Sequence, residues 1–553
     1  MAKKGAAAKA PAKKPPKAHS DARADSDSGS GGVSVRMYKQ GLGDCFLLSF
    51  AVAGRAKPVR VMIDCGVLKR TENEAIKLRS VVDDIAEETG GVVDLLIITH
   101  EHWDHIAGFS HAEDYFKTQP GQKAPKLQFG RVWLSWAENA QGDDLARSVL
   151  DDLGKKKKAA RVALGLVDSL GLEDRWTPLA ASNDANARRM IDDVATARAV
   201  FAFLGEDPTP ASKLAAAGAA AAKPAARPPG VTGLSLGETM DWLRSLVKPG
   251  DFCVPGQRRA VPGVDGVTAY ILGPPRDESL IKKMDATGEE GYALASKVSF
   301  LGAAERLEAP PDGKPAPGPF SVKLRVSREQ AMDSPFFRKA YGFPDDPLGD
   351  EGETWRRIDD EWLTSGLGQL ALQIDSRVNN TSLAIAFELA DGRTLIFPGD
   401  AQFGNWLSWD DLKFQDEAGK DLASTTKQLL NRAVFYKVGH HGSHNATRPA
   451  SLHQMTGSDL VAMIPTDEVF ALKQPKPGSW RMPAQGVAAD VAKFTANRIL
   501  RADRAAAELD KLAKQEGAAT DWAAFASRVT FSEKPLLPGL DPVDFPLWVE
   551  YRL

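Results

Sequence analysis

The chain has 553 residues, of which 43% are hydrophobic and 26% are charged, the balance of an ordinary globular protein. This composition excludes a largely disordered chain, a collagen-like fibre and a disulfide scaffold. The 70 basic and 73 acidic residues leave a net charge of −3, so no global positive field marks a nucleic-acid-binding protein. The length allows several domains, or one large core that carries insertions.

Cysteine content and hydropathy bear on the compartment. The three cysteines, Cys45, Cys65 and Cys253, form no CxxC pair and no regular spacing, which is typical of a reducing compartment. We find no run of about 18 apolar residues that would span a membrane, and no apolar segment behind the N-terminal lysines that would make a secretory signal. We therefore expect a cytoplasmic protein with no membrane partner. The sequence leaves the oligomeric state open.

The first part of the chain predicts a basic tail followed by an α/β core. Residues 1–32 hold almost no apolar side chain larger than alanine, which predicts a disordered basic tail. Order is expected from Val33, in a first core half at 33–135. Three strands, a helix and the apolar run of a buried strand are predicted there, and this succession is typical of α/β architecture. Their ranges are 33–40, 44–50, 59–64, 74–88 and 92–100.

Two insertions are expected to interrupt the core. The first, at 136–249, is mainly helical, with helices near 143–170, 184–204 and 236–247 and a low-complexity segment at 205–233. Core strands at 250–275 separate it from a second, polar insertion at 276–368. The second half of the core is expected at 369–553, with a C-terminal helix and strand. Its predicted strands are 371–375, 382–389, 394–400, 433–441, 460–465 and 547–553, and its helix is 484–515.

The strongest signal for chemistry is the segment HEHWDH at 100–105. Imidazole nitrogens and carboxylate oxygens suit zinc and its first-row neighbours. In an extended segment His100 and His102 lie on one side, and as the chain turns Asp104 and His105 can face a second ion. A single histidine is usually an ordinary core or surface residue, but six of the nine histidines fall into two clusters. We therefore predict a metal site.

A second cluster, HHGSH at 440–444, follows the predicted strand at 433–438. Because neighbouring strand residues face opposite sides, His440 and His441 are not expected to bind the same ion. One of them is expected to be a ligand, and the other a substrate contact or a group behind the ligands. Another predicted strand ends at Asp400. An acid there is often a turn residue, but beside two histidine clusters it is a candidate bridging ligand.

Taken in chain order, these motifs resemble the metallo-β-lactamase fold. A strand followed by Asp64-Cys65-Gly66 comes first, then HxHxDH, FPGD and HHGS. More narrowly, three segments resemble the branch similar to the hydrolase domain of the ComEC competence protein. They are GLGDC at 41–45, NNTSLAIAFELADGRTLIFPGD at 379–400 and KVGHHGS at 437–443. The resemblance covers about 33–135, 250–275 and 371–470. It implies an αβ/βα sandwich with two insertions and with a two-metal site at one edge of its sheets.

The resemblance also implies roles for individual residues. His100 and His102 would hold one ion, and Asp104 and His105 the other. Asp400 would bridge the two ions. Two divalent ions of this kind, zinc or alternatively manganese, are the expected cofactors.

One of His440 and His441 would complete the second ion site, and we favour His441. Asp64 would lie behind the ligands and orient them, as metal sites require. The candidate catalytic residues are Asp104, Asp64 and His444. The candidate substrate contacts are Asn379, Asn380, Ser443 and Asp44.

One departure from the wider family concerns the first ion. That family supplies a further metal histidine before the bridging aspartate, whereas here no histidine lies between His111 and His440. The segment at 379–382 reads Asn-Asn-Thr-Ser instead, as the ComEC-like branch also tends to have. Fewer nitrogen ligands favour weaker zinc binding or a preference for manganese.

The function implied is metal-dependent hydrolysis by a metal-bridging hydroxide. The ComEC-like resemblance makes phosphodiesters the leading substrate class, with nucleic acid among them. Two alternatives stay open. One is hydrolysis of a small ester, lactone or thioester, and the other is a non-catalytic scaffold of the same fold.

Overall fold

The computed structural model describes residues 32–169, 171–182, 184–206, 233–283, 326, 328–341, 366–474 and 480–553. The predicted tail at 1–32, the low-complexity segment at 205–233 and the second insertion at 276–368 lie largely outside the described residues. Within the described ranges, no helix combines the length and the apolar character needed to cross a membrane.

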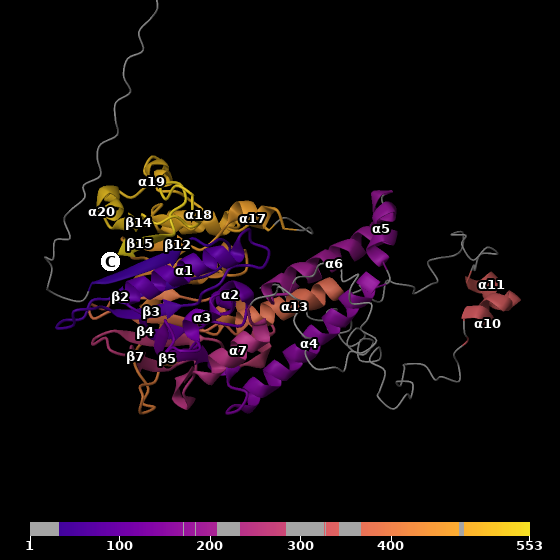
Figure 1. The fold of residues 1–553 in the computed structure, drawn as a ribbon, viewed down its shortest axis with the longest axis horizontal. Coiled ribbons are helices and arrows are strands. Elements are labelled where there is room, and N and C mark those ends of the chain that lie inside the picture. Colours follow the sequence, from indigo (N-terminus) through magenta and orange to yellow (C-terminus); the bar gives the residue numbers. More distant parts are fainter. Residues whose placement is uncertain are drawn as a thin grey trace, which may run out of the picture.

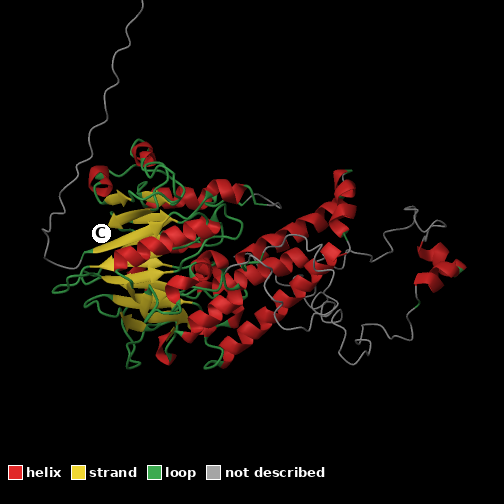
Figure 2. Cartoon of the chain, in the orientation of Figure 1, coloured by secondary structure: helices red, strands yellow, loops and turns green. Residues whose placement is uncertain are grey.

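The mixed α/β class predicted from the sequence is confirmed by two multi-stranded sheets with helices around them (Figure 2). The first sheet is antiparallel from β14 to β3 and parallel from β3 to β6. Its spatial order is β14 (Val529–Phe531), β15 (Trp548–Arg552), β1 (Val33–Tyr38), β2 (Phe46–Phe50), β3 (Val59–Ile63), β4 (Val92–Ile97), β5 (Gln128–Ser135) and β6 (Phe252–Cys253).

The second sheet comes mainly from the later part of the chain. Strands β13 to β10 are parallel, and β10 to β7 are antiparallel. Its spatial order is β13 (Ile499–Arg501), β12 (Val461–Ile464), β11 (Ala433–Lys437), β10 (Thr394–Phe397), β9 (Ala384–Glu388), β8 (Thr268–Gly273) and β7 (Arg258–Ala260).

Alternation along the strands explains why the two sheets face each other. In β2, Phe46, Leu48 and Phe50 belong to a core shared with the second sheet, whereas Leu47 belongs to the core on the opposite face. Successive strand residues point to opposite faces, so each sheet has two apolar faces to cover. The shared core also contains Ile385 and Phe435 of the second sheet.

Helices cover the outer face of each sheet. Those that contribute to the core outside the first sheet are α1 (Glu74–Thr89), α2 (Trp103–His111), α3 (Glu113–Phe116) and α7 (Leu236–Ser245). Those outside the second sheet are α14 (Phe403–Leu407), α15 (Thr426–Asn431), α16 (Pro449–Leu452) and α18 (Gln485–Phe494). The remaining short elements are η1 (Trp136–Glu138), η2 (Pro249–Asp251), α8 (Glu278–Ile281), α10 (Arg328–Asp333), α11 (Pro335–Tyr341), η5 (Gly439–Gly442), α17 (Glu468–Leu472), α19 (Ala507–Leu512) and α20 (Trp522–Ala526).

Four helices form a body of their own beside the sheets (Figure 1). They share one apolar cluster, and α13 packs against both α4 and α6. We call this group the helical body. Its members are α4 (Asp144–Ser169), α5 (Leu172–Ala181), α6 (Ala185–Phe203) and α13 (Leu367–Asn380).

The strand predicted at 371–375 is wrong, because this segment lies inside α13. Its buried apolar residues, Leu367, Leu370, Ile374 and Val378, recur at helical spacing, whereas Leu372 is exposed. Five residues are too short a window to separate this period from that of a buried strand.

The single helix predicted at 484–515 is also wrong. Helix α18 ends at Phe494, and the chain then forms β13 before α19 begins at Ala507. Ala496 and Asn497 have φ values of 48° and 64°, and this left-handed backbone ends a right-handed helix. The turn returns the chain to the second sheet.

Candidate functional site

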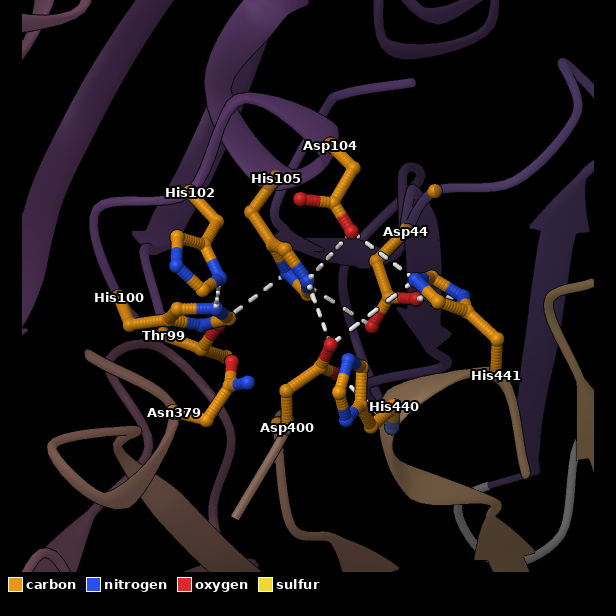
Figure 3. A network of polar contacts seen from close by, with 12 residues as sticks. Asp44, Thr99, His100, His102, Asp104, His105, Asn379, Asp400, His440 and His441 are labelled. Carbon is orange, nitrogen blue, oxygen red and sulfur yellow. Dashed lines mark hydrogen bonds and ion pairs between the residues drawn. The ribbon is translucent and has the colours of Figure 1, made fainter. Parts of the chain in front are cut away.

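The histidine and aspartate motifs meet where parallel strands of both sheets end. Asp64 follows β3 and the HEHWDH segment at 100–105 follows β4 in the first sheet, whereas Asp400 follows β10 and His441 follows β11 in the second. Figure 3 shows that the side chains of His100, His102, Asp104 and His105 meet those of Asp400 and His441. The fold thus joins residues that are hundreds of positions apart in the chain.

Four of these residues form a compact buried cluster that could hold a metal ion: Asp104, His105, Asp400 and His441. His105 Nε2 lies 3.1 Å from Asp400 Oδ2 and 3.5 Å from Asp104 Oδ2. His441 Nε2 lies 2.9 Å from Asp104 Oδ2 and 3.9 Å from Asp400 Oδ2. Ligand atoms at about 2.0 Å from a tetrahedral zinc ion are separated by about 3.3 Å, so this spacing suits a first-row metal. We call these four residues the ligand cluster.

The two imidazoles of the ligand cluster are held from behind. His105 Nδ1 lies 2.8 Å from Asp64 Oδ2, and His441 Nδ1 lies 2.6 Å from the carbonyl oxygen of Pro465. Each Nδ1 therefore donates to an oxygen, and each Nε2 is left as an acceptor that faces the other ligand atoms. This is the support that metal-bound histidines receive in proteins. Asp64 thus lies behind the ligand cluster, on the Nδ1 side of His105.

His100 and His102 form a second pair of imidazoles beside the ligand cluster. His100 Nε2 lies 3.1 Å from His102 Nδ1, and His100 Nδ1 lies 3.0 Å from the Thr99 hydroxyl. That hydroxyl donates to Asp64 Oδ2, so it can accept from His100. His102 Nε2 is buried and has no hydrogen-bond partner among the described residues. The pair therefore has nitrogen atoms to offer a second cation.

A buried lysine holds the carboxylates from the side of the second sheet. Lys437 Nζ donates to Asp400 Oδ1 at 2.9 Å, to Asp44 Oδ2 at 2.5 Å and to the Gly399 carbonyl oxygen at 2.8 Å. The backbone N–H of His440 also donates to Asp400 Oδ1, at 2.9 Å. One oxygen of Asp400 is thus fixed by the protein, and the other faces the ligand cluster.

The electrostatics of the site favour an added cation. Asp44, Asp64, Asp104 and Asp400 are all buried, and Lys437 pairs with two of them, Asp44 and Asp400. Burial opposes the charged form of His105, but the carboxylates of Asp400 and Asp104 outweigh it and raise the pKa of His105 well above its ordinary value. A proton is thus drawn to the place where a metal ion would neutralise the same charge.

Three of the other histidines of the site, His100, His102 and His440, are kept neutral. Burial lowers the pKa of His102 to about 3 and that of His440 to about 4. Burial also lowers the pKa of His100 well below its ordinary value. Metal ions bind the neutral form of imidazole, so His100 and His102 are in the state that a ligand needs.

The backbone at the second histidine pair differs from the strand assumed in the sequence prediction. Strand β11 ends at Lys437, and His440 and His441 have φ values of 42° and 54° within η5. Strand alternation therefore does not separate these two histidines. Such left-handed conformations cost about 1–3 kcal/mol each outside glycine and cluster at functional sites. They direct His441 into the ligand cluster, while His440 lies beside it.

Tight contacts between three loops fix the turn that carries Asp104 and His105. Asp44 N–H donates to the Asp104 carbonyl oxygen at 2.9 Å, and Cys65 N–H donates to that of His105 at 2.7 Å. A Cβ added at Gly66 would lie 2.3 Å from the backbone of Asp104 and His105. The glycine is therefore required by close approach of the chains, which explains the Asp-Cys-Gly sequence after β3.

The predicted substrate contacts Asn379 and Asn380 differ in their surroundings. We call the ligand cluster together with His100 and His102 the centre. Asn379 is buried beside His100 at the centre, as Figure 3 shows, and its Oδ1 has no hydrogen-bond partner among the described residues. Asn380 donates to the carbonyl oxygens of Ile281 and Lys283 and accepts from the backbone N–H of Asn405, which is a structural role.

Ser443 and Asp44 complete the set of predicted substrate contacts, and His444 is the remaining candidate catalytic residue. The Ser443 hydroxyl donates to Asn445 Oδ1 at 2.9 Å, and His444 is exposed. Neither joins the ligand cluster. Asp44 is buried against Lys437 behind the ligands, a position that suits charge balance rather than substrate contact.

The helical body covers the centre. The ring of Phe203, in the last turn of α6, lies 5.5 Å from that of His102 and 6.1 Å from that of His440. Phe203 also stacks on Trp480 at 5.2 Å, and it is 3% exposed. From α4, Lys157 pairs with Glu101 inside the HEHWDH segment. Two helices outside the sheets thus contact the histidine motifs directly.

Sequence reasoning missed several of these residues. A lysine in the apolar run AVFYKV was a usable signal for Lys437, because a buried strand rarely carries an unpaired charge. Phe203 carried no comparable signal, since it lies in an ordinary stretch outside the motifs. Models of protein families, curated proteins and solved structures give no match to this chain.

Proposed function

We propose that the chain is a metal-dependent hydrolase with the metallo-β-lactamase αβ/βα sandwich, interrupted by two insertions of which the first is mainly helical. The two facing sheets with helices outside each support this architecture. The order of the motifs along the chain supports the same assignment.

One observation carries the proposal. His105 and His441 each direct Nε2 at Asp104 and Asp400, while each Nδ1 is bound to an oxygen behind it. Three polar atoms of this cluster, Asp104 Oδ1, His105 Nε2 and Asp400 Oδ2, are buried without a hydrogen-bond partner among the described residues. Unpartnered buried polar atoms are costly, and a bound cation would satisfy them.

The donor set fits two divalent ions. Asp104, His105, Asp400 and His441 would hold one, and His100, His102 and Asp400 the other, with zinc or manganese as candidates because nitrogen and oxygen ligands are mixed. When bound, such ions supply an acidified water as nucleophile and stabilise the charge of the attacked group. The protein orients the ligands through Asp64, Pro465 and Lys437 and excludes bulk water with Phe203.

We propose phosphodiesters, nucleic acid among them, as the substrates. The low-lying pKa values of His102 and His440 leave these imidazoles uncharged, so the ions would be the main positive charges at the reacting group. A phosphodiester anion gains more from such charge than a neutral ester does.

The test is hydrolysis of bis(p-nitrophenyl) phosphate by the full chain, with zinc or manganese added and with chelator. An Asp400→Ala variant removes the carboxylate that both ions would share. An Asp411→Ala variant removes an exposed aspartate eleven positions later and is the matched control. We expect metal-dependent turnover in the wild type and the control and none above background in Asp400→Ala.

The other outcomes are equally informative. Bound metal without phosphodiester turnover would contradict the substrate class and direct the search to esters, lactones and thioesters. A protein that binds neither metal, or whose turnover survives Asp400→Ala, would overturn the proposed function and leave a scaffold of the same fold.

A further inference from the structure

A carboxylate outside all the motifs lies beside the centre. Asp375 is on α13, one helical turn before Asn379, so the two side chains share a face of the helix. Asn379 points at the centre from that face (Figure 3). The helical body therefore presents a carboxyl group to the metal motifs.

The contacts of Asp375 place it between the two sides of the centre. Its Oδ2 accepts from Asn379 Nδ2 at 3.1 Å and from Gln402 Nε2 at 3.4 Å. Gln402 follows Asp400 by two positions, and its Nε2 lies 3.5 Å from His440 Nδ1. Asp375 thus contacts Asn379, which lies next to His100, and also Gln402, which lies next to His440.

The other carboxyl oxygen, Oδ1, is the informative atom. It is buried and has no hydrogen-bond partner among the described residues, as is also true of Asn379 Oδ1, Gln402 Oε1 and His440 Nε2. Because Oδ2 already accepts two amide N–H groups, a proton on this carboxyl group resides on Oδ1. In its acid form the group thus carries a buried donor that no described residue accepts.

The surroundings of Asp375 favour that acid form. Burial is the main cause, and the negative charges of Asp104 and Asp400 add to it, so that the pKa of Asp375 rises to about 7. His440 lies behind Gln402 and is neutral near pH 7. On the other helices packed against α13, Asp193 of α6 lies at Gly368, nearly two turns away from Asp375.

Arg377 of α13 and Lys156 of α4 both pair with Asp152. Their charges are therefore already balanced by a carboxylate of the helical body. The charges that act on Asp375 are those of the centre.

We propose that Asp375 is a catalytic residue that donates the proton to the leaving oxygen during hydrolysis, an inference that rests on the proposed function. Attack of a water-derived nucleophile forms one P–O bond, and the P–O bond to the leaving group breaks. The electron pair of the broken bond goes to the leaving oxygen, which takes the proton from Asp375 Oδ1. The resulting carboxylate regains a proton from water.

The test compares two substrates that differ only in the basicity of the leaving group. Methyl p-nitrophenyl phosphate releases a stable anion that leaves without protonation, whereas methyl phenyl phosphate releases a more basic one. A general acid typically contributes about 10²–10⁴-fold. For Asp375→Asn, we therefore expect kcat on the phenyl ester to fall by about 100-fold or more, and kcat on the nitrophenyl ester to fall less than about threefold.

Two further measurements separate this role from others. Metal content after dialysis should equal that of the wild type, because Asp375 is no ligand in the proposal. In the metal-free protein, the melting temperature of Asp375→Asn relative to wild type should rise as the pH increases from about 4 to about 7. Over this range the unfolded wild-type group has lost its proton while the folded group keeps it, so the wild type loses stability and the variant does not.

Asp193→Asn is the matched control. Burial raises the pKa of Asp193 to about 6, and the charges that act on it are those of Arg189 and Asp192 rather than those of the centre. We expect Asp193→Asn to leave the ratio of the two kcat values unchanged.

The alternatives are distinguishable. An equal loss of kcat on both substrates would show a structural role for Asp375, and a loss of metal content would show that it is a ligand. An unchanged kcat on the phenyl ester would show that it has no role. Each of these results overturns the proposal. These results leave the proposed function intact as long as the wild type hydrolyses the nitrophenyl ester with metal. If the wild type hydrolyses neither ester, the proposed function itself fails.

Discussion

The ammonium group of Lys437 donates to Oδ1 of Asp400 at 2.9 Å, and the opposite oxygen of Asp400 faces His105 Nε2 at 3.1 Å. The lysine comes from the middle of the second sheet, and the histidine from the turn after β4 of the first. Asp400 thus binds the buried lysine with one oxygen and faces the ligand cluster with the other. Burial opposes the ammonium charge, but Asp400 and Asp44 outweigh it and raise the pKa of Lys437.

We predict that Lys437→Met destabilises the metal-free protein strongly. The variant leaves two buried carboxylates, Asp44 and Asp400, without their cation, and breaking a buried pair costs about 3–5 kcal/mol. Denaturant unfolding in the presence of chelator measures the loss. Adding Asp44→Asn to Lys437→Met should recover part of it, because one uncompensated charge is removed.

Lys427→Met is the control for Lys437→Met, because Lys427 is exposed on α15 and should change the free energy of unfolding by less than about 0.5 kcal/mol. Equal stability of Lys437→Met and wild type would show that the pair with Asp400 contributes nothing.

A second prediction concerns the pH dependence of the metal-free protein. Burial lowers the pKa values of His100, His102 and His440. Below about pH 6.5 the unfolded chain binds protons that the folded chain does not. Each of these histidines therefore removes about 1.4 kcal/mol of stability per pH unit as the pH falls toward its folded pKa. For His102 this window reaches down to about pH 3.

The opposite shift applies above pH 6.5. Carboxylates raise the pKa values of His105 and His441 in spite of burial, so the stability that their protons contribute is lost as the pH rises through the folded pKa values. We therefore expect these two histidines to lower the melting temperature in chelator as the pH rises above 6.5. Saturating metal should remove the alkaline decline, because the ion takes the place of these protons.

His102→Gln and His453→Gln serve as test and control for this pH profile. As the pH falls below 6.5, the melting temperature of His102→Gln should rise relative to that of the wild type. His453→Gln should show no such rise, because the His453 side chain is 49% exposed. A melting-temperature difference between His102→Gln and wild type that stays constant from pH 4 to pH 6.5 would contradict the assignment of the buried histidines.

Local signals account for what could be predicted from the sequence. The strands of the first sheet were predicted because residues such as Val33, Val35 and Met37 alternate toward one core, and the ligand motifs stood out by residue type and spacing. Helix α13 was missed because its period extends over more residues than the apolar run ALQID. The short β13 was missed because a helical pattern surrounds it.

Long-range contacts account for the rest. His441 and Asp104 are 337 positions apart in the chain, and no local pattern says which of two adjacent histidines reaches that aspartate. The left-handed backbone of His440 and His441 determines which of the two histidines reaches Asp104. This conformation follows the end of β11 and is not signalled by the local sequence. The cover by Phe203 likewise depends on how the helical body packs.

A third prediction concerns the close approach at Gly66. A methyl group there would collide with the backbone of Asp104 and His105 at 2.3 Å, and backbone atoms cannot move aside as a flexible side chain can. We expect Gly66→Ala to destabilise the protein by about 3 kcal/mol or more, since overpacking of a rigid site is costly. Because the collision displaces the turn that carries two ligands, metal affinity measured by calorimetry should also fall.

Gly237→Ala in α7 is the control for Gly66→Ala. A Cβ at that position has nothing within 4 Å, and alanine is favoured over glycine inside a helix by about 0.5–1 kcal/mol. Gly237→Ala should therefore keep or raise stability and leave metal affinity unchanged. Wild-type metal affinity in Gly66→Ala would show that the loop contact does not hold the ligand turn.

The last prediction concerns the aromatic cover over the centre. Phe203 contacts the rings of His102 and His440 and stacks on Trp480, so access to the ligands requires the end of α6 to move. Phe203→Ala should cost about 3–5 kcal/mol of stability, as removal of a buried phenylalanine does. It should also speed the loss of bound metal to excess chelator by about tenfold, the effect of a local opening that is about 1.4 kcal/mol easier.

Phe201→Ala distinguishes this local effect from general loosening. Phe201 is 1% exposed in the same helix, but it packs inside the helical body, with Arg161 5.7 Å from its ring. Its removal should cost similar stability and leave the rate of metal loss unchanged. If both variants release metal equally fast, the cover opens with the whole helical body, and Phe203 is no separate barrier.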